Sequence, residues 1–99
     1  MKIYKKAIKE ILKKGWAVTV FDDFDMLSKT EHCTKYSEII DDIECCDIVQ
    51  VHIADNNKKY IGIFSVIHDY GIEDDEYIND YTVSKTNQEY NSLMENLYQ

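Results

Sequence analysis

Apolar side chains recur every three or four positions in three stretches of the chain, and this spacing predicts three amphipathic helices. The first helix covers residues 2–14, and the second runs from an N-cap at Thr34 to near Cys46. The third helix follows a cap at Thr86 or Asn87. The apolar stripes of the three helices consist of Ile3, Tyr4, Ala7, Ile8, Ile11 and Leu12, then Tyr36, Ile39, Ile40 and Ile43, then Tyr90, Leu93, Met94, Leu97 and Tyr98.

The segment after the first helix predicts a β-hairpin, because its apolar residues alternate with a period of two. Residues 16–21 form the first strand and residues 24–27 the second, with an acidic turn between them. The polar residues 28–34 are expected to connect this hairpin to the second helix. The side chains on one face of the first strand are Trp16, Val18 and Val20.

A second hairpin is predicted between the second and third helices. Residues 47–54 alternate in the same way, residues 55–58 have a turn composition, and residues 59–68 return with apolar side chains on both faces. A strand that is apolar on both faces is typical of the interior of a sheet. Gly62 within it indicates a place where another side chain crosses closely. Residues 77–81 add a short edge strand in one version of this fold.

The predicted order of elements is α-β-β-α-β-β-α, in a single domain that covers residues 1–99. This order favours an α+β fold. We expect a four- or five-stranded, mostly antiparallel sheet with the helices packed on one of its faces.

Composition narrows the range of functions. The chain has 44% hydrophobic residues, which argues against intrinsic disorder. It carries 19 acidic residues against 11 basic ones, all lysine, for a net charge of −8. A chain without guanidinium groups is poorly suited to bind DNA or RNA directly. Because there is no secretory signal pattern, long apolar run or disulfide framework, we expect a cytoplasmic protein without membrane contact.

The charge is divided unevenly along the chain. The first fourteen residues hold six lysines and one glutamate, whereas the remaining 85 hold five lysines and 18 acidic residues, a net charge of −13. Acidic residues gather at the first hairpin turn and after the long strand, which predicts a surface that binds a basic partner, typically a nucleic-acid-binding protein. The alternative is a solvated segment that maintains solubility. The predicted partner-binding residues are Asp22, Asp23, Asp25, Asp69, Glu73, Asp74, Asp75, Glu76, Asp80 and Tyr77.

No motif for catalysis or for a cofactor is present. The three glycines cannot build a phosphate-binding loop or a nucleophile elbow, and neither CxxC nor HExxH spacing occurs. We therefore expect a protein that is not an enzyme, with no catalytic residues, no cofactor and no metal site. One alternative remains: a two-residue turn at residues 56–57 would place Cys45 opposite His68, and His52 opposite Ile61. Cys45, Cys46 and His68 could then serve a thiol or metal enzyme.

Three motifs spread over residues 8–82 carry a resemblance to known proteins. They are Gly15-Trp16-x-Val18-x-Val20-x-Asp22, the strand at residues 47–54, and Ser65-Val66-Ile67 followed by Gly71-x-x-Asp74-x-Glu76-x-Ile78-x-Asp80-Tyr81-Thr82. In these motifs the chain resembles small phage and prophage accessory proteins, although Ser65 stands where tryptophan tends to precede the Val-Ile pair. The resemblance implies a non-enzymatic, phage-encoded binding protein of the host cytoplasm. Several proteins of that kind block host enzymes or defence systems such as CRISPR–Cas.

Pattern, charge and resemblance together predict an inhibitor that occupies the basic nucleic-acid-binding surface of a host complex. A second hypothesis is a structural or regulatory homodimer, because residues 61–67 present a second apolar face that one helix layer does not cover.

Overall fold

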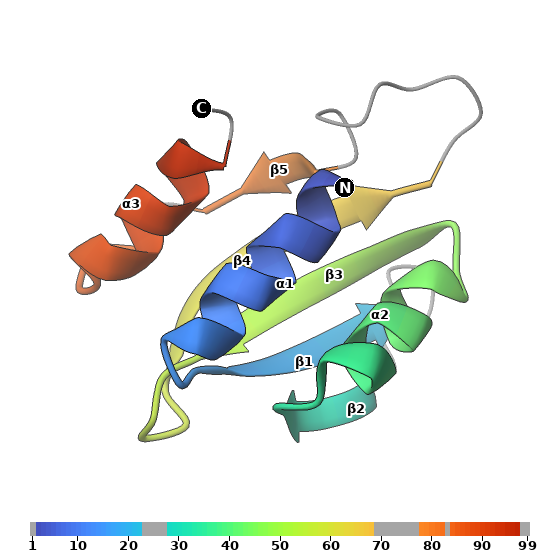
Figure 1. Ribbon diagram of the computed structural model, residues 1–99, viewed down its shortest axis with the longest axis horizontal. Coiled ribbons are helices and arrows are strands. Elements are labelled where there is room, and N and C mark those ends of the chain that lie inside the picture. Colours follow the sequence, from blue (N-terminus) through green and yellow to red (C-terminus); the bar gives the residue numbers. More distant parts are fainter. Residues whose placement is uncertain (1, 23–27, 69–77, 83, 98–99) are drawn as a thin grey trace.

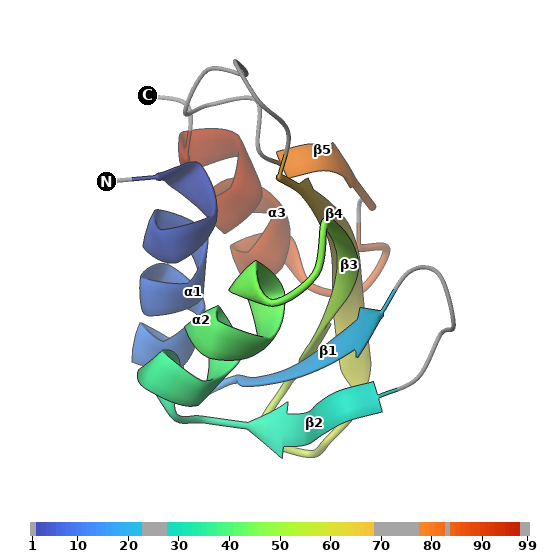
Figure 2. The same cartoon turned by 90° about the vertical axis from the view of Figure 1, so that its right-hand side faces the viewer.

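The computed structural model describes residues 2–22, 28–68, 78–82 and 84–97 (Figure 1). Five strands form one antiparallel sheet in the order β2-β1-β3-β4-β5. The three helices lie in a single layer against one face of this sheet (Figure 2). The predicted α+β class, the predicted order and the one-sided helix layer are confirmed. The elements are α1 (Ile3–Lys13), β1 (Ala17–Asp22), β2 (Ser28–Cys33), α2 (Tyr36–Glu44), β3 (Ile48–Ala54), β4 (Tyr60–Ile67), β5 (Ile78–Tyr81) and α3 (Gln88–Asn96).

The hydrophobic core lies between the helices and the sheet. The predicted alternation is confirmed in β3, where Val49, Val51 and Ile53 are fully buried beneath the helix layer, and in β1 at Val18 and Val20. The buried stripes of α1, α2 and α3 complete one continuous cluster. The strand residues of this cluster include Val18, Val20, Val49, Val51, Ile53, Phe64 and Val66.

At Gly62 a side chain of α3 lies directly against the backbone of β4. A Cβ atom at Gly62 would lie 2.0 Å from Cζ of Tyr90, whose ring is fully buried. The predicted close crossing at this glycine is thus confirmed, with Tyr90 as the crossing side chain. The third helix begins after Asn87, whose Oδ1 accepts a 3.0 Å hydrogen bond from the backbone N–H of Tyr90. This confirms one of the two caps predicted for that helix.

The second helix begins one residue later than predicted. Lys35, rather than Thr34, is its N-cap, and no side chain caps the helix. The polar segment before the second helix was predicted to be a connection. It is instead the edge strand β2, which pairs with β1. An edge strand needs few apolar residues, because its backbone hydrogen bonds to the neighbouring strand supply the pairing. The strand predicted at residues 24–27 lies outside the described residues.

The second hairpin has a different register from the predicted one. Its turn spans three residues, and Lys58 adopts the left-handed conformation with φ 63°. Such a turn commonly leaves an extra residue on the returning strand. Here the shift comes where Ala54 pairs with Tyr60 and Ile53 with Gly62, so that Ile61 is the extra residue. Tyr60 therefore lies on the opposite face of the sheet from Phe64 and Val66, beside His52.

Candidate functional site

The two acid-rich segments are attached to the same end of the sheet. Asp22 at the end of β1 pairs with Val49, Val49 with Val66, and Val66 with Ile78 at the start of β5. This row marks the end of the sheet at which residues 23–27 and 69–77 leave the described strands; we call it the acidic end.

The spacing of the strands brings these attachment points close together. Neighbouring strands lie about 4.8 Å apart, so the ends of β1 and β4 are separated by roughly 10 Å. That distance is comparable to the screening length at physiological ionic strength, about 8 Å. Charges near the two attachment points therefore reinforce one another at low ionic strength and are partly screened from each other at physiological ionic strength.

Only part of the predicted partner-binding set lies in the described residues. Asp22 is half-buried, and its Oδ2 accepts a 3.5 Å hydrogen bond from Sγ of Cys46. Asp80 pairs with Ser65 in the register of β4 and β5. The structure adds the exposed Asp47, immediately before β3, which the sequence reasoning left out. The sequence alone did not indicate this position, because it follows from the antiparallel pairing of β3 with β1. Asp23, Asp25, Asp69, Glu73, Asp74, Asp75, Glu76 and Tyr77 lie outside the described residues.

A cluster of polar side chains connects α1 and α2 beside the acidic end. The buried Tyr4 of α1 donates its hydroxyl hydrogen bond to Glu44 at the end of α2, and Nζ of Lys5 lies 3.7 Å from the same carboxylate. The hydrogen bond from Tyr4 holds the pKa of Glu44 below its ordinary value of 4.5. The ring of Tyr4 also meets the ring of His68 edge-on at 5.2 Å, and Nε2 of His68 lies 3.2 Å from the carbonyl oxygen of Ile43. These contacts give His68 a structural role at the joint of α1, α2 and β4.

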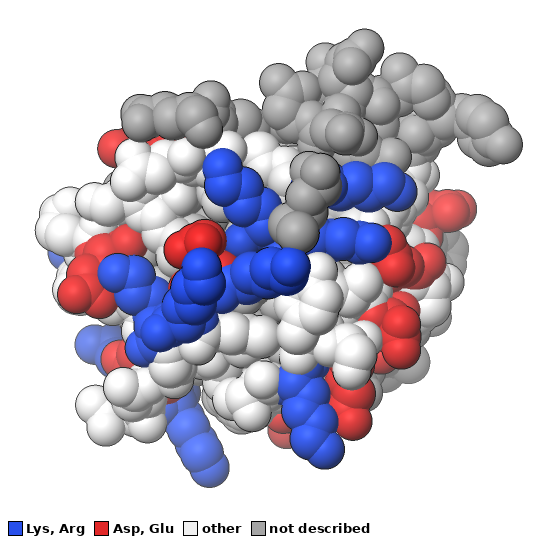
Figure 3. Space-filling model, viewed as in Figure 1, with Lys and Arg blue, Asp and Glu red and all other residues white. Residues whose placement is uncertain are grey.

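On the face shown in Figure 3, lysines gather over α1, and acidic side chains line the side of the molecule near α2. The first turns of α1 lie beside the acidic end, where Lys5 pairs with Glu44. Lys13 of this helix is bound to Glu10 at 3.2 Å in an exposed pair, a type of pair that contributes little to stability. The lysines of α1 and the acidic side chains near α2 are thus neighbouring surfaces that meet at Lys5 and Glu44.

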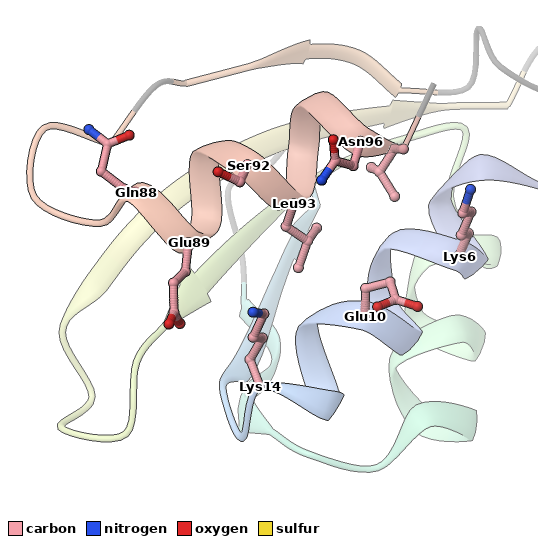
Figure 4. Close-up of a pocket in the computed structure, with 9 residues that line it drawn as sticks. Lys6, Glu10, Lys14, Gln88, Glu89, Ser92, Leu93 and Asn96 are labelled. Atoms are coloured by element: carbon pink, nitrogen blue, oxygen red, sulfur yellow. The ribbon is translucent and has the colours of Figure 1, made fainter. Parts of the chain in front are cut away.

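A groove of about 400 Å³ separates α1 from α3 (Figure 4). Leu93 contributes an apolar wall, while Lys6, Lys14, Glu10 and Glu89 contribute charges of both signs. Because the cations and anions alternate along the groove, its charges select no single class of ligand.

The face of the sheet opposite the helices carries a chain of ring contacts. Phe21 and His52 lie 4.5 Å apart between ring centroids, His52 and Tyr60 lie 5.7 Å apart, and His32 stacks on Tyr60 at 5.6 Å. Below them, Thr19 is only 1% exposed, and its Oγ1 accepts a 2.9 Å hydrogen bond from the backbone N–H of His32. Burial lowers the pKa of His52 from its ordinary value of 6.5. We call this surface the open face.

The hypothesis of a thiol or metal enzyme was based on Cys45 lying opposite His68 in the second hairpin. The hairpin register pairs His52 with Ile63, not Ile61, and the backbone N–H of His68 with the carbonyl of Asp47 rather than with Cys45. The predicted facing of Cys45 and His68 is therefore wrong, because the turn is longer than two residues. Within the described ranges, no group of three or more histidine, cysteine, aspartate or glutamate side chains could hold a metal ion. The sulfur atoms of Cys45 and Cys46 lie 3.7 Å apart as thiols rather than as a disulfide.

Comparison with known proteins gives no relative for this chain. No family model, no curated protein and no solved structure matches it. The resemblance to phage accessory proteins stays a prediction. None of the helices in the described part of the chain has the length and apolar character needed to cross a membrane.

Proposed function

We propose that the protein is a non-enzymatic binding protein that places its acidic end on a basic, nucleic-acid-binding surface of a host complex and thereby excludes DNA or RNA. One observation carries this proposal. The chain enters and leaves both acid-rich segments at the same end of the sheet, where Asp22 and the exposed Asp47 also lie.

The rest of the molecule supports this orientation. The pairing of Glu44 with Tyr4 and Lys5 connects α1 and α2 beside the acidic end. These contacts hold the helices in place next to this end of the sheet. The lysines of α1 gather over the helix layer (Figure 3). A molecule polarised in this way is oriented by the field of a basic partner before contact, which raises the rate of productive association.

The partner class follows from the charge. Surfaces that bind nucleic acids carry lysine and arginine arranged for a dense row of phosphates. A concentrated set of carboxylates binds the same lysine and arginine side chains and thereby competes with the phosphates. The resemblance described above adds that such a protein, encoded by a phage, inhibits a defence complex such as CRISPR–Cas.

A charge-reversal experiment tests the proposal. Immobilised protein is used to capture a complex from a bacterial lysate at low salt, and the affinity of the purified complex is then measured with and without competing DNA or RNA. The variant Asp74→Lys, Asp75→Lys, Glu76→Lys should lose at least about tenfold in affinity. Nucleic acid should compete with the wild-type protein for the complex.

The matched control is Glu31→Lys, Glu89→Lys, Glu95→Lys, which changes the net charge equally at exposed glutamates in β2 and α3. This control should keep most of the affinity. Equal losses in the two triple variants would mean that only the total charge matters. Absence of competition by nucleic acid would contradict occupation of its binding surface.

A further inference from the structure

We propose that the adjacent thiols of Cys45 and Cys46 form a binding site for one trivalent arsenic centre, supplied as arsenous acid or as an organic arsenoxide. The two residues follow α2 directly and stand just before β3. Cys45 is exposed, Cys46 is half-buried, and their sulfur atoms lie 3.7 Å apart. This inference does not rest on the proposed function, because it concerns the two thiols and not the acid-rich segments.

The end of α2 sets the positions of both sulfur atoms. Cys45 is the C-cap of the helix and keeps a helical backbone, with φ −82° and ψ −9°. Its Sγ donates a 3.3 Å hydrogen bond to the carbonyl oxygen of Asp42, and Sγ of Cys46 donates to Oδ2 of Asp22 at 3.5 Å. Because thiols are weak hydrogen-bond donors, a ligand that displaces both protons breaks only weak contacts.

The backbone disfavours a disulfide between these two neighbours. Consecutive Cα atoms lie about 3.8 Å apart across a trans peptide, whereas disulfides usually join Cα atoms at least about 4.4 Å apart. A sulfur–sulfur bond would also draw the two sulfur atoms in from 3.7 Å to about 2.0 Å. A single atom bound to both sulfur atoms leaves them farther apart. The pair of Cys45 and Cys46 is therefore better suited to chelation than to oxidation.

The separation of the sulfur atoms selects the geometry of the bound centre. With bonds of about 2.3 Å, a length typical of thiolate ligands, sulfur atoms 3.7 Å apart subtend an angle of about 107°. This angle excludes a linear two-coordinate ion. It suits tetrahedral zinc, but a structural zinc site needs four ligands, and the described part of the chain offers no group of three or more histidine, cysteine, aspartate or glutamate side chains for a metal. Trivalent arsenic is thiophilic and pyramidal, and it brings its third ligand with it.

Binding is a ligand exchange in which nothing is oxidised or reduced. An arsenoxide, R–As=O, forms two As–S bonds with the two thiols, and its oxygen leaves as water with both thiol protons. Arsenoxides and arsenous acid are uncharged. They are therefore not repelled by the carboxylate of Asp22, which contacts Cys46, or by the exposed Asp47 next to it in the sequence.

Cys33 provides a single thiol for comparison in the same chain. It is 8% exposed at the end of β2, and its Sγ lies 3.8 Å from the carbonyl oxygen of Lys35 and 3.5 Å from Oε2 of Glu38. The nine residues of α2, about 14 Å long, separate Cys33 from the adjacent pair. One arsenic atom cannot bridge that distance, so the site requires both Cys45 and Cys46.

Titration of the reduced protein with phenylarsine oxide, read by intact mass spectrometry, tests the proposal. The wild-type protein should take up one phenylarsenic group, keep it in excess mercaptoethanol and lose it to dithiothreitol. Cys45→Ser and Cys46→Ser should each weaken binding at least about a hundredfold, because each variant leaves one sulfur ligand. Cys33→Ser is the matched control and should bind like the wild type. Circular dichroism of each variant checks that the fold is retained.

Two results would overturn the site. One is a wild-type protein that loses the phenylarsenic group to mercaptoethanol, and the other is equal binding by all three serine variants. The charge reversal at residues 74–76 leaves both thiols in place and should not change arsenical binding, so this proposal and the proposed function fail independently.

The same titration in urea tests whether the fold presets the two sulfur atoms. The unfolded chain keeps both cysteines, but their side chains must be immobilised on binding, so the affinity should be at least about threefold lower. Equal affinity of the folded and unfolded protein would contradict a preset geometry at the end of α2.

Discussion

The two faces of the sheet are built from alternate residues of the same strands, and they differ in what they do. On the helix face, Val51 and Ile53 are completely buried among aliphatic side chains. On the open face, their neighbours Gln50 and His52 are half-buried, joined by a 3.2 Å contact between Oε1 and Nε2, and surrounded by rings. The helix face stabilises the fold by burying aliphatic side chains, whereas the open face carries half-buried polar and aromatic side chains that contact one another.

The largest expected difference in stability between the two faces comes from replacing two isoleucines of β3. Ile53→Ala should destabilise the protein by about 2–5 kcal/mol, because it leaves a cavity in a closed core. Ile48→Ala, at a side chain that is 41% exposed, should cost less than about 1 kcal/mol in the monomer. Urea unfolding of both variants at low protein concentration measures the two costs. Similar costs would remove the distinction between the faces.

The close crossing of α3 gives the next effect. Gly62→Ala places a methyl group where the Tyr90 ring lies, which should cost about 1–3 kcal/mol. On the open face, Ser65→Ala adds no atom to a tight contact and should be almost neutral. Thermal or urea unfolding compares the two. In a Tyr90→Leu background the cost of Gly62→Ala should shrink, and a cost that stays constant would argue against the ring as the cause.

The cap of α3 provides a smaller effect on the helix side. Asn87→Ala removes the acceptor for the Tyr90 N–H and should destabilise the protein by about 1 kcal/mol. Gln88→Ala, at the exposed next position, is the control and should change stability little. The free energies of unfolding of the two single variants decide whether the cap contributes. Equal values for both would mean that it does not.

Acidification should lower the free energy of unfolding in two pH ranges, one set by His52 on the open face and one by Glu44 at the end of α2. This is the smallest of the expected effects. Burial lowers the pKa of His52, so the unfolded chain binds more protons and stability falls as pH drops through 6.5. The pKa of Glu44 is lowered by its hydrogen bond, so its contribution is present above 4.5 and is lost as pH falls further. Unfolding measured at a series of pH values should show both losses. His52→Gln should abolish the first and Glu44→Gln the second.

Local patterns predicted most of the fold because they report which side of an element is apolar. The stripes of α1 and α2 and the alternation of β1 and β3 each depend on residues close in sequence. The polar strand β2 was missed because its pairing with β1 comes from backbone hydrogen bonds, which leave no apolar pattern at an edge. The position of Asp47 at the acidic end was missed because it depends on the order of the strands.

Taken by itself, the amino-acid sequence determined the three helices, the strands of the second hairpin, the close approach at Gly62 and the division of charge between the first helix and the rest. Only the tertiary structure decided the register of that hairpin, because the left-handed Lys58 and the extra residue Ile61 depend on how the turn closes. It also decided that both acid-rich segments leave the sheet at one end and that the rings gather on the open face. These features arise from pairing between strands distant in sequence, which periodicity along the chain does not encode.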